Sequence, residues 1–278
     1  MNDAAPLIPL LLSGLPGPMA AEVAVLAQAA PDLRLLPVGL SSGARHGSRV
    51  TIAADDIRLV APGREAVDAP TGTIAVDFST PGAALDNARW FIDRGLPFVM
   101  GTTGFDANEL RTRVAGAGLT AVVAPNMAAP IVMIQAALRW LADEFSGGCA
   151  GTDAELTVRE SHQQSKRDTS GTARALVASF RRLGIEFEPD RIECLRDPER
   201  QRRELDIPEA FLDAHAFHRY ELACAADTVG IVLEHNVVGR RVYAEGTLAA
   251  VRFLQRRIAA GETGRIFDME DVLRGPRA

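Results

Sequence analysis

The polar stretch ESHQQSKRDTSGT contains the residue types needed for proton transfer and for binding a carboxylate. His162 can supply a proton near neutral pH, and Lys166 can anchor a carboxylate or be the acid itself. Ser170, Gly171 and Thr172 precede an alanine-rich helix, whose free amides and dipole suit a carboxylate. A surface loop with a capped helix would explain His162 and Lys166 alone. The cluster favours a catalytic site for a small dicarboxylate.

A second polar segment, HNVVGRRVYAEG, places Arg240 and Tyr243 at a strand-to-helix junction between two predicted domains. Arg240 can bind a second substrate carboxylate or the cofactor, because a guanidinium fork matches such oxyanions. An interdomain salt bridge is the structural alternative. We assign Arg240 to the substrate and Tyr243 to the cofactor. His215 and His218 have a spacing that metals can use, but no third ligand is evident, so we expect no metal site. Alternation in a strand explains these two histidines more simply.

The segment GLPGPMA, where a strand turns into a helix, is a candidate site for the pyrophosphate of a dinucleotide. Gly14 and Gly17 would let backbone amides approach the phosphates, and Pro18 and Met19 would lie in the first helical turn, where the dipole favours an anion. A simple glycine-proline turn is the alternative, because GxGxxG is incomplete and Pro16 and Pro18 lack amide donors.

The next strand ends in the sequence LSS and not in the acidic residue that would bind a ribose 2′-hydroxyl. Ser41 and Arg45, with help from Arg49 or His46, would instead meet a 2′-phosphate. The expected cofactor is therefore NADPH, with NADH as the alternative. Solvated loop charges are the structural explanation for each of these residues taken singly.

Two loops of small residues, DFST and GTTG, each follow a predicted strand. Because the carboxyl ends of parallel strands converge on the ligand crevice, their joint placement favours a cofactor site over simple helix capping. We expect cofactor contacts from these loops and from two residues of the later segment APNM: Phe78, Ser79, Gly101, Thr102, Thr103, Pro125 and Met127.

The elements that must position these loops alternate along the first half of the chain. Apolar runs without polar alternation, each followed by a helical pattern, predict the α/β class, with a Rossmann-like, doubly wound parallel sheet. The predicted strands are Leu7–Ser13, Leu33–Leu40, Ile74–Phe78 and Pro97–Gly101, the helices are Met19–Ala29 and Ala83–Arg94, and the pattern repeats over Asn108–Val123.

The alternation of predicted strands and helices ends near Asn126. Predicted helices at 131–144 and 172–183 are followed by strand-like segments, of which 215–225 and 228–238 are the longest. This pattern predicts an inserted α+β domain with a largely antiparallel sheet. The last helix, Gly246–Ala260, returns to the first domain. We expect a dinucleotide-binding domain at 1–127, completed by 241–278, and a second domain at 128–240.

Composition limits the classes of partner and compartment. With 278 residues, of which 47% are hydrophobic, the chain can form one large or two medium domains. A net charge of -6 and a pI near 5.5 argue against a nucleic acid or a membrane surface as partner. The three cysteines lack metal-ligand spacing, and the first apolar run soon breaks at glycine and proline. We expect a cytoplasmic enzyme.

Together these motifs resemble those of the 4-hydroxy-tetrahydrodipicolinate reductases, also called dihydrodipicolinate reductases. The resemblance covers most of the chain through G-x-x-G-x-M, DFSTP, GTTGF, E-S-H-Q-x-x-K-x-D-x-SGTA and H-N-x-x-G-R-x-x-Y-A-E-G-T with IFDMEDVL. Gln163 directly after His162, the single residue between Asp168 and SGT, and HAFHRYEL are similar to the plant-type branch of this family.

The resemblance implies a Rossmann domain interrupted by a domain that binds the substrate and builds a homo-oligomer, a tetramer or a dimer. It implies NAD(P)H-dependent reduction of dihydrodipicolinate to tetrahydrodipicolinate in diaminopimelate and lysine biosynthesis. In that reaction His162 would be the proton donor, Lys166 would bind a carboxylate and support protonation, and the SGT turn would hold a carboxylate. The glycine turn would line the pyrophosphate and GTTG the nicotinamide.

This sequence departs from the family pattern at the glycine turn. Pro16 and Pro18 replace residues that usually can donate a hydrogen bond to phosphate, and Ala20 replaces the last glycine of the motif. The segment APNMAAP also differs from the sequence that the family usually has at this place. These departures keep two alternatives open. One is a paralogous NADPH-dependent reductase of another cyclic imine carboxylate, and the other is a non-catalytic NADP-binding protein.

Overall fold

The computed structural model describes residues 7–224, 226 and 228–274 and divides the chain into two compact units. Unit 1 contains residues 1–129 and 241–278, and unit 2 contains residues 130–240. The first boundary lies two residues after the expected position, and the second lies at it. Positions 1–6 and 275–278 of the expected first domain, and 225 and 227 of the second, lie outside the described residues.

Unit 1 is built on a nine-stranded sheet of order β13-β8-β7-β6-β1-β3-β5-β4, with β2 also paired to β1. The strand pairs in the described residues are parallel except for β4 and β5, which are antiparallel. The strands are β1 Ile8–Ser13, β2 Leu33–Leu35, β3 Val38–Leu40, β4 Arg49–Ile52, β5 Asp55–Val60, β6 Ile74–Asp77, β7 Phe98–Met100, β8 Thr120–Val123 and β13 Arg265–Phe267.

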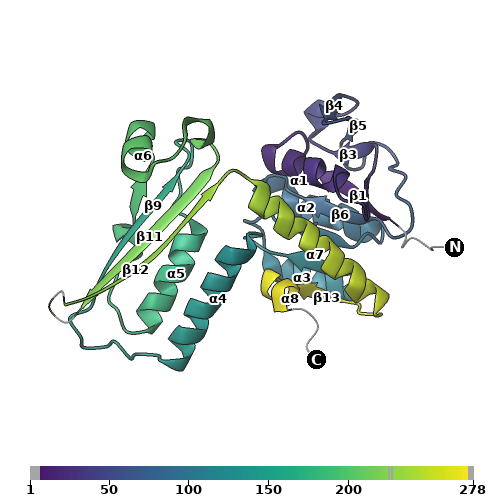
Figure 1. Ribbon diagram of the computed structural model, residues 1–278. Helices are drawn as coiled ribbons and strands as arrows, with labels where there is room; N and C mark the ends of the chain where they lie inside the picture. Colours follow the sequence, from purple (N-terminus) through teal and green to yellow (C-terminus); the bar gives the residue numbers. More distant parts are fainter. Residues whose placement is uncertain (1–6, 225, 227, 275–278) are drawn as a thin grey trace. The chain divides into compact units, whose positions relative to one another are not determined.

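Helices cover both faces of this sheet (Figure 1). They are α1 Pro18–Gln28, α2 Pro81–Asp93, α3 Ala107–Gly116, α7 Arg241–Ala259 and α8 Met269–Arg274, with a 3-10 turn, η1 Gly43–Arg45. Helix α1 packs beside α7, and α2 packs beside α3. Leu10, Leu11 and Leu12 are all buried in β1 although successive side chains point to opposite faces. A strand covered on both faces therefore reads as an unbroken apolar run.

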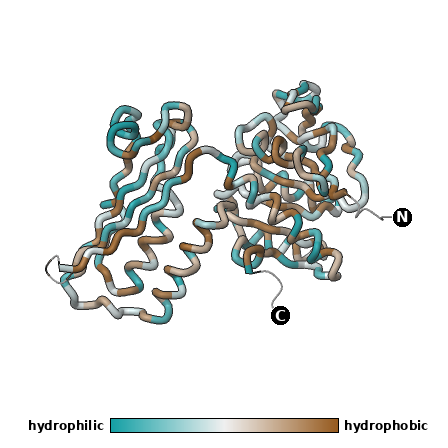
Figure 2. Tube along the Cα trace, in the orientation of Figure 1, coloured by the Kyte–Doolittle hydropathy of each residue, from teal (hydrophilic) through white to brown (hydrophobic). Residues whose placement is uncertain are grey.

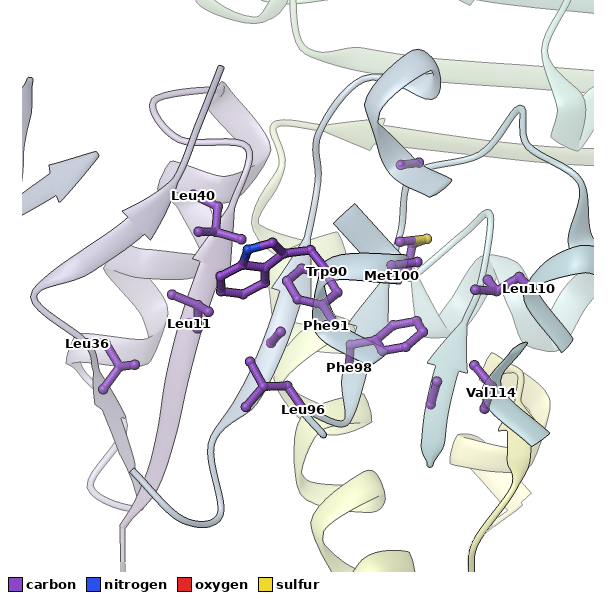
Figure 3. Close-up of a cluster of buried hydrophobic side chains, with 14 residues drawn as sticks. Leu11, Leu36, Leu40, Trp90, Phe91, Leu96, Phe98, Met100, Leu110 and Val114 are labelled. Carbon is purple, nitrogen blue, oxygen red and sulfur yellow. The ribbon is translucent and has the colours of Figure 1, made fainter. Parts of the chain in front are cut away.

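The core between the sheet and the helices α2 and α3 is a cluster of large apolar side chains (Figure 3). Phe91 of α2 and Phe98 of β7 are fully buried, with ring centroids 5.6 Å apart. Burying such a side chain stabilises the fold by about 1.5–3 kcal/mol. This packing fixes the ends of β6 and β7, from which the DFST and GTTG loops extend.

Two predicted features of unit 1 are wrong in detail. The run Leu33–Leu40 forms two strands, β2 and β3, because Pro37 lies between them and cannot donate to a strand ladder. Segment 41–73, in which no strand was predicted, contains the β4–β5 hairpin. Its turn places Ala53 at a φ of 50°, a conformation that glycine or asparagine normally signals, so the turn had no sequence signature.

Helix α7 also begins earlier than predicted, at Arg241 and not at Gly246. Gly246 lies inside the helix, where a Cβ atom would come 1.7 Å from the carbonyl oxygen of Met127. The glycine is thus needed for a close approach of helix and loop, and it does not mark the start of the helix.

Unit 2 contains a four-stranded sheet of order β10-β9-β11-β12. Strands β9, β11 and β12 are antiparallel, as expected, and the short β10 pairs with β9 in parallel. The elements are α4 Ala129–Glu144, β9 Glu155–His162, α5 Gly171–Arg182, η2 Pro189–Arg191, β10 Glu193–Leu195, α6 Pro198–Leu205, η3 Glu209–Phe211, β11 His215–Cys224 and β12 Val229–Val238. The sequence did not predict β10 and α6.

Helices α4 and α5 contribute apolar side chains to one core with the sheet of unit 2. Figure 2 shows that hydrophobic residues, in brown, recur along both helices. Leu176 and Phe180 of α5 pack in this core with Val158 of β9 and Tyr220 of β11. Alternation then places Glu160 and His162 on the same face of β9 as Val158. In the described part of the chain, no helix is long and apolar enough to cross a membrane.

Candidate active site

A pocket of about 880 Å³ lies in unit 1 at the carboxyl ends of β1, β3 and β6. Its lining contains seven of the predicted cofactor residues: Gly14, Gly17, Pro18, Ser41, Arg45, Phe78 and Ser79. The loops that sequence analysis singled out after separate strands therefore meet at one edge of the sheet, where nucleotides bind in such folds.

The glycine turn lies very close to the backbone of the loop after β6. Gly14 has a φ of 99°, and a Cβ atom there would lie 2.3 Å from the carbonyl oxygen of Phe78. The amide of Gly17 donates to the carbonyl of Gly14 at 2.8 Å. Within the described residues, the amides of Met19 and Ala20 have no backbone acceptor. The first turn of α1 therefore keeps two donors for a phosphate, although Pro18 supplies none.

Two arginines line the part of the pocket that follows β3 and β5. Arg45 was predicted from the sequence, and Arg64 was not. The Nη2 atom of Arg64 lies 3.7 Å from the position that a Cβ atom on Gly43 would take. Neither arginine forms an ion pair or side-chain hydrogen bond in the described residues. Arg49 instead pairs with Asp56 at 2.5 Å and does not line the pocket. The two unpaired guanidinium groups suit a 2′-phosphate.

His46, the other expected helper of Arg45, is also outside the pocket lining. Its Nδ1 accepts a hydrogen bond from the amide of Ala61 at 3.3 Å, so it holds the loop after β5. The size of the pocket, the open amides of α1 and the unpaired arginines together fit a nicotinamide dinucleotide.

A buried carboxylate joins the loops around this pocket. Asp77, at the end of β6, is fully buried and accepts hydrogen bonds from the hydroxyls of Ser13, Ser79 and Thr102 at 2.7, 2.9 and 2.8 Å. It also accepts a hydrogen bond from the side-chain amide of Asn87 at 2.9 Å. Thr102, predicted to touch the cofactor, thus holds the loop after β7 against the loop after β6.

The other predicted cofactor residues do not line the pocket. Gly101 lies under the ring of Phe78, where a Cβ atom would come within 2.2 Å of a ring carbon. Met127 is buried against Gly246, and burial raises the pKa of the half-buried Tyr243. The remaining members of this set are wholly or partly exposed: Met19, Thr103 and Pro125.

The predicted chemical residues of unit 2 meet around Glu160. This side chain is fully buried, and its Oε2 lies 2.6 Å from Nδ1 of His162. Its Oε1 accepts a hydrogen bond from the amide of Ser170 at 3.2 Å. Burial alone would raise the pKa of Glu160, but hydrogen bonds from His162 and Arg196 outweigh it and hold this pKa well below its usual range. Glu160 is therefore a carboxylate at every physiological pH.

Sequence reasoning assigned no role to Glu160 or to Arg196, the residue that follows β10. Its Nη1 and Nη2 donate to the two oxygens of Glu160 at 2.9 and 2.6 Å, and its Nε donates to the carbonyl of Lys166 at 2.9 Å. The segment ECLRDPER has no motif that would mark this arginine. Only the pairing of β10 with β9, which places Cys194 opposite Glu160, brings it to the site.

The SGT turn forms the N-terminus of α5. Ser170 is buried, and its hydroxyl lies 2.9 Å from Nε2 of His218. Helix α5 begins at Gly171 and has no acidic residue in its first turn. Among the described residues, the amides of Gly171 and Thr172 have no backbone acceptor. Two free amides at a helix N-terminus are a suitable cradle for a carboxylate.

Lys166 and Arg240 have different surroundings. The Nζ of Lys166 lies 3.0 Å from Oδ2 of the exposed Asp168, a partner that a substrate carboxylate can replace. Arg240 donates to the carbonyl of Asp213 at 3.0 Å, and within the described residues no hydrogen bond or ion pair joins it to Glu160 or His162. Lys166 thus lies in the Glu160 network through its backbone, whereas Arg240 is not bonded to that network.

His215 and His218 lie on opposite faces of β11, because three positions separate them and side chains alternate along a strand. His215 contacts the hydroxyl of Ser161 at 2.9 Å. His218 stacks near His235, with ring centroids 4.6 Å apart. Burial and the neighbouring histidines lower the pKa of His218 to about 2 and that of His235 to about 4.

The chain matches a family model described as dihydrodipicolinate reductase, N-terminus, over residues 8–127, and one described as dihydrodipicolinate reductase, C-terminus, over residues 131–273. These two matches cover almost all of the described chain and divide it close to the first boundary between the units, at 129–130, whereas the second match continues past the other boundary at 240–241.

Individual relatives agree with these matches. The chain is 38% identical over 273 residues to 4-hydroxy-tetrahydrodipicolinate reductase 1, chloroplastic, of Arabidopsis thaliana, covering 96% of this chain and 78% of that protein. It is 30% identical over 285 residues to 4-hydroxy-tetrahydrodipicolinate reductase of Rubrobacter xylanophilus, covering 96% and 98%. The fold is similar to that of dipicolinate-bound dihydrodipicolinate reductase from Paenisporosarcina, with a TM-score of 0.59, 14% identity and coverage of 94% and 97%.

Proposed function

The chain belongs to the dihydrodipicolinate reductase family, and from this premise we propose that it reduces dihydrodipicolinate with NADPH, using His162 and Lys166. The protein is an oxidoreductase of diaminopimelate and lysine biosynthesis, and its product is tetrahydrodipicolinate. The substrate forms when 4-hydroxy-tetrahydrodipicolinate loses water. One observation carries the residue assignment: His162 and the N-terminus of α5 are bound to the two oxygens of one buried carboxylate, that of Glu160.

The residues of unit 2 bind and protonate the substrate in this proposal. The free amides of Gly171 and Thr172 hold one carboxylate at the positive end of the α5 dipole. The ammonium group of Lys166 leaves Asp168 to bind a substrate carboxylate and to stabilise negative charge. His162 donates the proton from Nε2, while Nδ1 stays on Glu160. The reduced nicotinamide nucleotide, when bound, supplies the hydride.

The preference for NADPH over NADH rests on the pocket of unit 1. No acidic side chain follows β3, where one would hold a ribose 2′-hydroxyl, and Ser41, Arg45 and Arg64 line that position instead. Both arginines are free of carboxylate partners in the described residues. A 2′-phosphate would gain two charge-assisted contacts that NADH lacks.

The test of the proposed function is coupled turnover with purified protein. A dihydrodipicolinate synthase and its substrates generate the unstable substrate in the cuvette, and the loss of NADPH absorbance is followed. Other cyclic imine carboxylates are tried at the same concentration. A higher kcat/KM for one of these would favour the paralogue, and NADPH binding without turnover of any would favour the non-catalytic protein.

A homo-oligomer, a dimer or a tetramer, is part of the proposal. Large apolar side chains of unit 2 are exposed along α4 and along the edge strand β12: Met133, Ile134, Trp140, Leu141, Phe145, Val229, Ile231, Val232 and Val238. An exposed apolar row beside an unpaired strand edge suits burial against a second copy. Sedimentation of the purified chain at several concentrations tests this. The three free cysteines also fit a reducing compartment, and we propose the cytoplasm.

A further inference from the structure

We propose that the ion pair between the buried Glu160 and the partly buried Arg196 is the positioning device of this active site. It holds the proton donor His162, the loop that carries Lys166 and the amides at the N-terminus of α5 in fixed positions relative to one another. The inference rests on the proposed role of His162. It assigns a function to two residues that act through others and touch no substrate. Three observations support it.

The first observation is the completeness of the bonding. Glu160 is fully buried and accepts from Nδ1 of His162, from both terminal nitrogens of Arg196 and from the amide of Ser170, at 2.6 to 3.2 Å. The thiol of Cys194 donates to it at 3.2 Å. A buried carboxylate is tolerated only with such partners, and a bidentate arginine also fixes its plane. The ring of His162 is thereby held in one orientation.

The second observation is that Arg196 reaches the loop between β9 and α5. Besides its two bonds to Glu160, it donates to the backbone carbonyl of Lys166 at 2.9 Å and to that of Asp168 at 3.4 Å. Its side chain is 18% exposed, so water competes little for these bonds. One guanidinium therefore ties the segment that carries Lys166 to the strand that carries His162.

The third observation is the charge balance around His162. Glu160 faces it from β9 and Arg196 from the loop after β10, while His215 and His218 on β11 and His235 on β12 also interact with it electrostatically. In the following loop, Lys166 is paired with Asp168. The carboxylate favours a protonated imidazole and the guanidinium opposes it. The ion pair thus places one negative and one positive group beside the ring.

Removing one or the other member of this ion pair should then shift the pH at which His162 titrates in opposite directions. Removing the negative charge by Glu160→Gln should lower the pH at which His162 titrates by roughly one unit or more. Removing the positive charge by Arg196→Gln should raise it. If the pair had only a structural role, both variants would lose stability and activity. The direction in which the titration pH of His162 shifts would then not depend on which partner was removed.

The measurement is the NMR titration of the histidine rings in the full chain. Only five histidines are present, so the signal of His162 is identified by its loss in His162→Asn. The matched control is Glu193→Gln, which breaks the exposed Arg159–Glu193 pair one register position earlier on β9 and β10. We expect no shift in this control.

Activity provides the second readout. Both active-site variants should lose about ten- to a hundredfold in kcat, because a small misplacement of the donor has an effect of that size, while KM for NADPH stays unchanged. Shifts of equal sign, no shift in either variant, or a shift of equal size in Glu193→Gln would overturn the inference. If Glu160→Gln does not fold, the direction of the shift in Arg196→Gln decides alone. The titration needs no substrate, so failed turnover of the unmodified protein would reject the proposed function and leave this test intact.

Discussion

Nδ1 of His162 lies 2.6 Å from Oε2 of Glu160, two positions earlier on β9. The two side chains share a face of the strand because successive residues of a strand alternate. In the described part of the chain, Nε2 of His162 has no hydrogen-bond partner. It is thus the ring nitrogen that can carry a proton to the substrate, and the first prediction follows from this geometry.

His162→Asn should lower kcat about a hundredfold to ten-thousandfold, the usual contribution of general acid catalysis, and leave the thermal midpoint of unfolding almost unchanged. Lys166→Met should raise KM for the dicarboxylate and also lower kcat, because it removes the cation that binds the substrate. The check is steady-state kinetics beside thermal unfolding. Asp168→Asn, at the exposed partner of Lys166, is the control and should change either constant by only a few-fold.

Cofactor preference gives the second prediction. Arg45→Gln and Arg64→Gln should each weaken NADPH binding by roughly tenfold or more, the value of a charge-assisted hydrogen bond, with little change for NADH. Fluorescence titration of both cofactors measures this. Arg49→Gln is the control, because Arg49 pairs with Asp56 outside the pocket lining. A loss of the same size for NADH and NADPH in Arg64→Gln would remove Arg64 from the 2′-phosphate site.

The arginines show which site residues could be predicted from the sequence and which could not. Arg45 was predictable because it follows the end of β3 in a loop that must face the nucleotide. Arg64 follows β5, a strand whose hairpin turn at Ala53 carries no turn residue, so neither the strand nor its loop was expected. Likewise, Arg196 reaches Glu160 only through the pairing of β10 with β9. Local patterns predict loops at strand ends, but contacts across unpredicted strand pairs depend on tertiary structure.

Stability should fall in mild acid because of the buried His218 and the partly buried His235. The pKa of His218 is lowered to about 2 and that of His235 to about 4, so the unfolded chain binds protons below its ordinary value of about 6.5 while the folded chain does not. The stability that these two groups contribute is fully present above about pH 6.5 and is lost as the pH falls, down to about 4 for His235 and about 2 for His218. Each group should contribute roughly 1–2 kcal/mol of loss between about pH 7 and pH 5.

Urea unfolding at several pH values measures this loss. His235→Phe should flatten the dependence between pH 7 and pH 5 by about half, since one of the two groups is gone. An unchanged slope in the variant would show that His235 does not carry the effect. Glu160 acts in a lower window: its depressed pKa means that its contribution is present above the ordinary carboxyl value and is lost as the pH falls further.

Two glycines of unit 1 give opposite predictions. Gly246→Ala should destabilise the fold by about 3 kcal/mol, because its Cβ atom would meet the carbonyl of Met127 at 1.7 Å and α7 or the loop must move. Gly116→Ala, at the end of α3 with no atom within 4 Å of the new Cβ, should stabilise it by about 0.5 kcal/mol. Denaturant unfolding compares them, and equal effects would contradict the close contact at Gly246.

The most direct test of the account is NADPH oxidation by the unmodified protein with dihydrodipicolinate generated in the cuvette, beside His162→Asn under the same conditions. We predict turnover that depends on the substrate, is faster with NADPH than with NADH, and falls at least about a hundredfold in the variant. No substrate-dependent oxidation of either cofactor, or equal rates in the variant, would contradict the assignment of this reductase chemistry to the site around His162.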